Sequence, residues 1–456
     1  MIDNKMGDSG MEDNRIQDNR MEDKEDYLST LNERQLDAVT TTEGYVRIIA
    51  GAGTGKTKAL THRYAYLVNE LGISTSNILC VTFTNKAARE MSKRIRQMIG
   101  DSDTGYICTF HGFCVKLLRE DIHAINFPQN FVVMDDEDTE EILKTVYENA
   151  HIQSRTYTFD SARDHITALK SQMLHIPYLA EIGNEKLLAD YEKAEKVEDK
   201  VFLGYLYEQK KVYGLDYDDL ITIALYILQT DETKRIKWQE RMMYVMVDEF
   251  QDVSNSQYAL AEILSGYHRN LFIVGDPDQT IYTWRGAQIE YILEFDETHE
   301  NTRTIFLDMN YRSTPEILAV SNSLIEKNKK RLPHRLEAYK ESGRRPIYIH
   351  SRTTGDEAQW MTSEIQRLVS EGASYNEMAV LYRSHFVSRN IEESFIKAKI
   401  PYTLYSGVEF YKRKEIKDVL AYLRMIVYSD DLSFRRVINE PKRNFGKKRM
   451  ALVKAY

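Results

Sequence analysis

The sequence predicts an α/β fold in which buried parallel strands alternate with helices. Short apolar runs rich in Val, Ile and Leu recur at 45–49, 77–83, 244–247 and 271–274. Each run ends in glycine or polar residues, and segments with helical periodicity separate the runs. Continuous apolar runs of this kind are typical of strands buried on both faces, as in parallel sheets covered by helices.

The first run leads into the glycine-rich segment Ala50-Gly51-Ala52-Gly53-Thr54-Gly55-Lys56-Thr57. A strand, a glycine turn and a helix that opens on Lys-Thr together predict a phosphate-binding loop. Its backbone N–H groups and the positive helix N-terminus surround a β-phosphate. We expect Lys56 to reach the β- and γ-phosphate oxygens and Thr57 to ligate Mg²⁺. Ala50 replaces the usual first Gly, a position that needs only a small residue. A flexible glycine loop, the alternative, fits this context less well.

Two further strand ends carry candidate catalytic residues. The apolar run 244–247 delivers Asp248 and Glu249, where a phosphate-loop enzyme needs acids opposite its lysine. Asp248 is the predicted Mg²⁺ ligand, and Glu249 is predicted to orient and deprotonate the attacking water. The run 271–274 precedes Gln279, which is placed to sense the γ-phosphate. Acidic residues can follow any surface strand. They indicate a catalytic site here because a phosphate-binding loop lies upstream in the same chain.

A candidate nucleic-acid platform follows Gln279 directly. Tyr282, Trp284 and Arg285 bring two aromatic rings and a guanidinium within four positions. Stacking of unpaired bases on such rings is worth about 1–3 kcal/mol per base and tolerates any sequence. The alternative is that Trp284 belongs to the core, because Trp is usually well buried. If the platform interpretation holds, one segment joins nucleotide to nucleic acid, as a motor requires.

Composition limits the remaining possibilities. The chain has 456 residues and a net charge of −9, which argues against histone-like nucleic-acid binding. Residues 1–26 are acidic with a five-residue period and are predicted to be a disordered tail, whereas residues 405–456 are basic. The three cysteines lack metal-ligand spacing, which suggests a reduced cytosol. No apolar run approaches the roughly 18 residues of a membrane span. We expect a soluble cytoplasmic protein without a membrane partner.

In order, the motifs resemble those of the UvrD/PcrA/Rep group of superfamily 1 DNA helicases over residues 28–456. The resemblance is carried by residues 31–35, the phosphate loop, 81–91 (VTFTNKAAREM), 109–114 (TFHGFC), 247–252 (VDEFQD), 274–287 (VGDPDQTIYTWRGA) and 307–313 (LDMNYRS). The fourteen-residue block at 274–287 excludes superfamily 2. A guanine-specific Asn-Lys-x-Asp reading of Asn85-Lys86 fails, because Ala88 stands where the Asp is required.

The resemblance implies roles for further residues. Gln35 would recognise adenine, Tyr311 would stack on it, and Arg312 would act as an arginine finger on the γ-phosphate. Lys58 stands beside the nucleotide where the family usually has Arg. The implied single-strand path includes Phe83, Asn85, His111, Tyr282, Trp284 and Arg285. His111 could instead simply cap a turn. The implied activity is ATP- and Mg²⁺-dependent 3′→5′ movement on single-stranded DNA, with unwinding of duplex at single/double-strand junctions.

The resemblance also implies a domain division. Two RecA-like domains, 1A and 2A, would hold ATP between them. Domain 1A would combine 27–115 with 205–306, interrupted by a helical insertion 1B at 116–204, and 2A would span 307–404. The residues at 346–350 and 378–383 themselves predict further strands within 2A. Residues 405–456 would begin an insertion 2B. The family's motifs V and VI follow that insertion, so 2A is expected to be incomplete and the chain to be a fragment. Repair or replication proteins are possible partners. An ATP- and DNA-binding module without turnover, or part of a helicase–nuclease, are the alternatives.

Overall fold

The computed structural model describes residues 27–100, 103–384, 387–405, 414–428 and 430–454. The acidic tail predicted at 1–26 lies outside the described residues. Contacts divide the chain into two compact units, Met1–Arg344 and Arg345–Tyr456, and each is described by itself below. Within the described ranges, no helix combines the length and the apolar character that crossing a bilayer demands.

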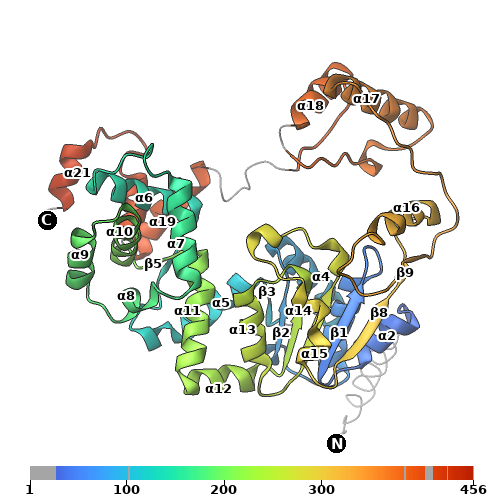
Figure 1. Ribbon diagram of the computed structural model, residues 1–456, viewed down its shortest axis with the longest axis horizontal. Helices are drawn as coiled ribbons and strands as arrows, with labels where there is room; N and C mark the ends of the chain where they lie inside the picture. The colour runs from blue at the N-terminus through green and yellow to red at the C-terminus, as the bar shows by residue number, and fades with distance from the viewer. Residues whose placement is uncertain (1–26, 101–102, 385–386, 406–413, 429, 455–456) are drawn as a thin grey trace, which may run out of the picture. The chain divides into compact units, whose positions relative to one another are not determined.

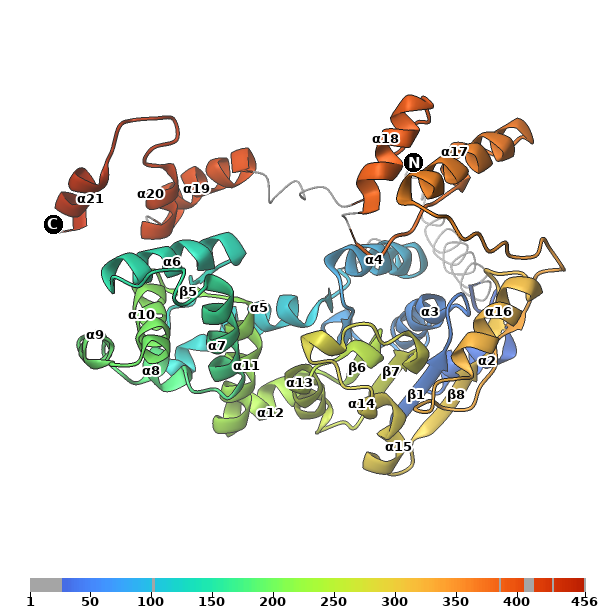
Figure 2. The same cartoon turned by 45° about the horizontal axis from the view of Figure 1, so that its top comes forward.

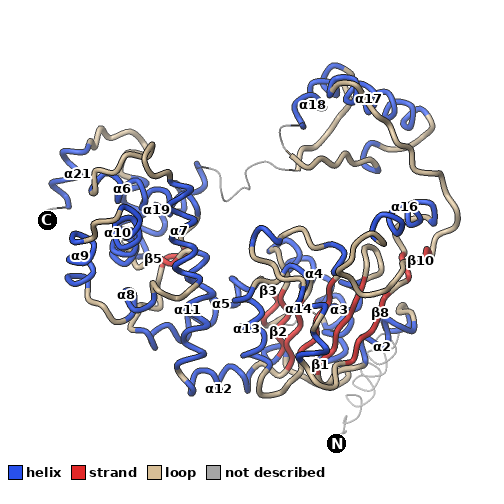
Figure 3. Tube along the Cα trace, in the orientation of Figure 1, coloured by secondary structure: helices blue, strands red, loops and turns tan. Residues whose placement is uncertain are grey.

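A six-stranded parallel sheet forms the centre of the first unit (Figure 1). Its strand order is β3-β2-β6-β7-β1-β8. The strands are β1 (Tyr45–Ala50), β2 (Ile78–Val81), β3 (Tyr106–Cys108), β6 (Tyr244–Val247), β7 (Leu271–Gly275) and β8 (Arg303–Leu307), which appear in red in Figure 3. The predicted α/β fold is therefore confirmed, and each predicted apolar run in this unit supplies a strand. Because the strands are parallel, their carboxyl ends, which carry the motifs, meet at one edge.

Helices cover both faces of this sheet (Figure 2). One face packs against α2 (Glu33–Thr40), α3 (Lys56–Asn69) and α4 (Asn85–Ile99). On α4, Met91 and Ile95 are buried while the basic residues face solvent. The other face packs against α5 (Phe110–Asp121), α11 (Tyr217–Thr230), α12 (Glu232–Arg241), α13 (Asn255–Ser265), α14 (Glu290–Leu293) and α15 (Phe295–Thr298).

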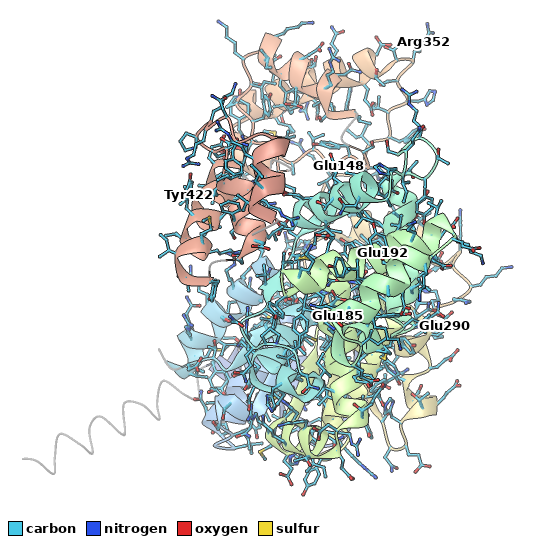
Figure 4. All side chains as sticks on the ribbon, turned by 90° about the vertical axis from the view of Figure 1, so that its left-hand side faces the viewer. Glu148, Glu185, Glu192, Glu290, Arg352 and Tyr422 are labelled. Carbon is cyan, nitrogen blue, oxygen red and sulfur yellow. The ribbon has the colours of Figure 1, made fainter. Side chains whose placement is uncertain are left out.

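The stretch between α5 and α11 is helical, as predicted. It contains α6 (Asp136–Asn149), α7 (Phe159–Ser171), α8 (Ile176–Ala180), α9 (Asn184–Lys193) and α10 (Val197–Lys211), with a short parallel pair of β4 (Val132–Val133) and β5 (Gly214–Leu215). Glu148 on α6 and Glu185 and Glu192 on α9 are exposed (Figure 4). Lys170 on α7 is fully buried, with its ammonium 2.6 Å from Asp216 and 2.7 Å from Asp219. This ion-pair cluster ties the helical stretch to the start of α11.

The chain that follows β8 forms the last elements of the first unit, two short strands and one helix. It forms β9 (Met309–Asn310), α16 (Pro315–Ile325) and β10 (Glu337–Ala338), and β10 pairs in parallel with β9. Because β9 follows directly on β8, residues 309–313 lie beside the end of β1 and its glycine loop. The contact is direct, since the Tyr311 N–H donates to the Gly53 carbonyl at 2.9 Å.

The second unit is helical in its described residues. Helices α17 (Thr354–Ser370) and α18 (Ser388–Lys397) share a small apolar core, followed in the chain by α19 (Lys414–Tyr428), α20 (Asp431–Val437) and α21 (Lys447–Lys454). The strands predicted at 346–350 and 378–383 are wrong, because both segments are irregular. A strand requires a hydrogen-bonded neighbour. Instead, Tyr348 is 85% exposed and Leu381 is 93% exposed.

Candidate nucleotide and nucleic-acid site

The glycine loop connects β1 to α3 in a conformation that only glycine adopts easily. Gly53 has φ of 74°, and Gly55, at the N-terminal cap of α3, has φ of 91°. A Cβ added to Gly53 would lie 2.7 Å from the Cβ of Arg312. Glycine therefore serves both the left-handed turns and the close approach of the neighbouring chain. The predicted strand, turn and helix are all present, and α3 begins at Lys56.

The acidic strand end lies opposite the lysine of the loop. The Lys56 ammonium is 3.4 Å from a carboxylate oxygen of Glu249. The neighbouring β2 ends at Val81, whose carbonyl accepts the Asp248 N–H at 2.9 Å. The hydroxyl of Thr82 donates to Asp248 Oδ2 at 3.4 Å. Two neighbouring strands thus hold the acids beside the phosphate loop.

Burial makes these carboxylates unusual. Burial, with a smaller contribution from the Glu249 charge, raises the pKa of Asp248 to about 7. The same two causes raise the pKa of Asp252 to about 6. Oδ1 of Asp248 is buried and has no hydrogen-bond partner among the described residues. A buried carboxylate oxygen without a partner is costly unless a cation or donor satisfies it. The site therefore suits a divalent cation.

A cavity of about 350 Å³ joins these acids to the aromatic residues. Its lining includes Thr57, Asp248, Glu249, Gln279 and Tyr282. Four residues of the predicted nucleotide site therefore share a single cavity with Tyr282 of the predicted stacking platform. Gln279 also donates from its side chain to Asp276, which follows β7. These facts place Gln279 beside the acids, as expected for a residue that senses phosphate.

Two aromatic residues, Phe83 and Tyr282, line this cavity, and Trp284 lies beside Tyr282. Phe83 and Tyr282 stack with ring centroids 4.8 Å apart, and the Trp284 ring centre is 6.4 Å from that of Tyr282. Trp284 is 68% exposed, which excludes the alternative that it belongs to the core. The Arg285 side chain lies outside what the structure describes. An exposed indole beside two stacked rings is suited to stacking on unpaired bases.

Asn310, which the sequence analysis missed, fastens the phosphate loop to the segment that carries Arg312. It is 1% exposed. Its Nδ2 donates to the Ala52 carbonyl at 2.5 Å. Its Oδ1 accepts the N–H of Arg312 at 2.9 Å and that of Ser313 at 2.7 Å. Arg312 itself is exposed. The signal available in the sequence was an Asn directly before the two residues predicted to touch ATP.

Gln35 and Tyr311 flank the loop from the other side. Gln35 is 2% exposed, and its Nε2 donates to the Thr54 carbonyl at 2.9 Å. Its Oε1 accepts the Asn32 N–H at 3.2 Å, which closes a capping box at the start of α2. The Asn32 amide donates to the Tyr311 hydroxyl at 2.6 Å. Lys58 donates to the Thr30 carbonyl at 2.5 Å. These contacts gather the predicted adenine residues at one end of the loop.

Two predicted DNA residues have more ordinary surroundings. Asn85 is exposed in the first turn of α4, which Thr84 caps. His111 lies in the first turn of α5, and Thr109 rather than His111 caps that helix. The His111 ring is edge-on to Tyr217 with centroids 5.6 Å apart. Burial lowers the pKa of His111, so the neutral ring is favoured. Neither residue lines the cavity described above.

The parallel sheet, the glycine loop and the acidic strand end define a phosphate-loop nucleotide-binding protein with a RecA-like fold. The chain belongs to the UvrD/REP helicase family. Residues 31–300 match the model of the UvrD/REP helicase N-terminal domain. Residues 305–456 match that of the UvrD-like helicase C-terminal domain.

Relatives agree with this assignment. The chain is 40% identical over 431 residues to the ATP-dependent DNA helicase PcrA of Staphylococcus aureus strain Mu50. The match to the protein of the same name from Staphylococcus epidermidis ATCC 12228 has the same identity and length. In both cases it covers 94% of this chain and 58% of the relative. The chain thus spans little more than half the length of these relatives.

Proposed function

We propose that the protein is an ATP-dependent DNA helicase that moves 3′→5′ on single-stranded DNA and unwinds the duplex ahead of it. The observation that carries this proposal is the shared cavity, which the acids Asp248 and Glu249 and the aromatic Tyr282 line together. A change in nucleotide state at one end of the cavity therefore acts directly on the residues proposed to hold bases. Family membership and the names of the relatives support DNA as the nucleic acid.

The proposed ATP site uses the residues predicted from sequence. The N–H groups of the loop and the ammonium of Lys56 bind the phosphates, while Gln35 and Tyr311 hold the adenine end. Thr57 and Asp248 would hold Mg²⁺, and the buried, unpartnered Oδ1 of Asp248 fits that role. Bound Mg²⁺ neutralises phosphate charge.

Hydrolysis is assigned to Glu249, Gln279 and Arg312. Glu249 takes the proton of the attacking water, because its carboxylate lines the cavity and lies beside Lys56. Gln279 contacts the γ-phosphate from the adjacent strand end. Arg312 is carried by the segment fastened to the loop, which supports its proposed role as an arginine finger that stabilises charge on the γ-phosphate in the transition state.

DNA movement is assigned to the aromatic group. Bases stack on Phe83, Tyr282 and Trp284, and each nucleotide cycle shifts them by altering the cavity that Tyr282 shares with the acids. Such stacking is independent of sequence, as a translocating enzyme requires. Arg285, Asn85 and His111 complete the proposed strand contacts. The domain division 1A, 1B, 2A and 2B, and a cytoplasmic location like that of bacterial DNA, are parts of the same proposal.

The test is phosphate release by the intact protein with and without single-stranded DNA. We expect DNA to stimulate hydrolysis, and Glu249→Gln to lower the stimulated rate by about 10²–10⁴-fold while nucleotide still binds. Glu240→Gln, the same change at an exposed position on α12, is the matched control and should behave as the parent. Nucleotide binding without DNA-stimulated release would instead indicate a binding module. Partial duplexes with 3′ or 5′ tails test the direction.

A further inference from the structure

The segment 331–336, between α16 and β10, contacts the phosphate loop at one end. At one end, Leu336 lies so close to Gly51 that a Cβ added to this glycine would be 2.5 Å from the leucine Cδ2. The Leu336 carbonyl accepts a hydrogen bond from Asn322 Nδ2 at 3.1 Å, which holds the segment to α16. Leu332 packs against the main core cluster. The segment is therefore anchored where any movement of the loop would meet it.

At its other end the segment reaches the residues that carry Gln279. The guanidinium of Arg331 donates to Asp278 Oδ2 at 2.9 Å and to the His334 carbonyl at 3.0 Å. Asp278 donates its N–H to Asp276 Oδ1 at 3.0 Å, and the other oxygen of Asp276 accepts from the Gln279 side chain. A continuous series of contacts thus links Arg331 to Gln279.

Stability alone does not explain this ion pair. The side chains of Arg331 and Asp278 are only 15% and 10% exposed. Nε of Arg331 and Oδ1 of Asp278 are buried and lack partners among the described residues. Buried ion pairs rarely repay the cost of desolvation, and unpaired buried atoms add to that cost. An ion pair that adds little net stability is better explained by the residues that it positions.

A cation site is the competing explanation for this cluster. Asp276, Asp278 and His334 place one ligand atom each within 4.8 Å of one another. However, the guanidinium of Arg331 already neutralises Asp278, and Asp276 is occupied by the Asp278 N–H and by Gln279. A cation would have to displace these donors. The cluster is therefore assigned to the arginine and not to a metal.

We propose that Arg331 is a positioning residue for Gln279. It ties the turn at 276–279 to the segment whose Leu336 lies against Gly51 of the phosphate loop, so that nucleotide binding in the loop and the γ-phosphate contact of Gln279 change together. This inference rests on the proposed function, because it concerns the same ATP site. It predicts that Arg331 affects the rate of hydrolysis and not the binding of ATP or DNA.

The experiment compares two neighbouring substitutions in the intact protein. Arg331→Met removes the guanidinium and keeps most of the apolar stem. Lys330→Met is the matched control, because Lys330 makes a 2.7 Å ion pair with Glu290 at the exposed surface, where Figure 4 labels Glu290. Arg331→Met should lower the DNA-stimulated kcat by about 10–100-fold, the range that small misplacements of a catalytic group produce. Its KM for ATP and its affinity for single-stranded DNA should stay at the parental values, and Lys330→Met should match the parent throughout.

A second set of variants removes the ambiguity of a folding defect. Asp278→Asn should reproduce the loss of kcat. The kcat of the double variant should be no lower than that of the less active single variant, because both changes break the same contact. Arg331→Lys should restore part of the rate. Equal kcat values for Arg331→Met and Lys330→Met would overturn the inference. So would a double variant whose loss of kcat is the product of the two single losses, or an Arg331→Met protein with a raised KM for ATP and an unchanged kcat. A parent without DNA-stimulated hydrolysis would refute the proposed function instead, so the two failures are distinguishable.

Discussion

Replacement of Asn310 by alanine tests whether the loop and the Arg312 segment form one structural element. The Asn310 side chain makes three hydrogen bonds, to Ala52, Arg312 and Ser313. Each such bond contributes about 1 kcal/mol net, and more where the partner stays buried and unpaired. Both N–H donors are only partly buried, so water can replace part of what they lose. We therefore expect Asn310→Ala to lower the free energy of unfolding by about 2–3 kcal/mol.

The same substitution should weaken ATP binding. Release of the Ala52 carbonyl loosens the loop, and a loss of about 1 kcal/mol corresponds to roughly fivefold weaker affinity. The assays are urea unfolding and titration with a fluorescent ATP analogue. Asn77→Ala is the control, because this residue at the amino end of β2, away from the loop, donates from its side chain to the Arg241 carbonyl at 2.8 Å, and its loss should cost about 1 kcal/mol without changing ATP affinity. An Asn310→Ala protein with parental stability and parental ATP affinity would show that Asn310 does not join the loop to the Arg312 segment.

Two further predictions concern the platform and the acids. Trp284→Ala should weaken binding of single-stranded DNA by about 1–3 kcal/mol, measured by fluorescence anisotropy. Trp360→Ala, which removes a half-exposed indole in the second unit, is the control and should bind as the parent does. Equal affinities for the two variants would exclude Trp284 from the single-strand path. Because the folded-state pKa of Asp248 is raised to about 7, folding favours its protonated form. Metal-free protein should therefore lose stability as pH rises from about 4 towards 7, and Asp248→Asn should stabilise it about 2 kcal/mol more at pH 8 than at pH 5.5. Denaturation in EDTA measures this, and parallel pH profiles for both proteins would contradict the assignment.

Local signals explain what the sequence predicts correctly. The strand over 244–247 was expected with the bounds that the structure shows, because its apolar residues are contiguous and polar residues follow at once. The glycine loop is equally local, since its turn depends on small residues at fixed spacing. The placement of Asp248 and Tyr282 around one cavity then follows from the parallel strand order, which brings strand ends together.

Features that depend on distant partners were not predictable. Asn310 contacts Ala52 across 258 positions, and Arg331 contacts Asp278 across 53. Neither pairing leaves a periodic trace in the sequence. The strands wrongly expected at 346–350 and 378–383 show the converse, because their composition favours strands but pairing decides whether a strand forms. The bond from Gln35 to the Thr54 carbonyl spans 19 positions and could not be foreseen either.

The proposed function requires that nucleotide and DNA bind around one cavity, so that the affinity for one depends on the presence of the other. The most direct measurement is the dissociation constant for single-stranded DNA, with and without a non-hydrolysable ATP analogue. The two values should differ by about 5- to 150-fold, the usual range of coupling between linked sites. Equal values in the two nucleotide states would contradict the claim and leave a protein that binds the two ligands separately.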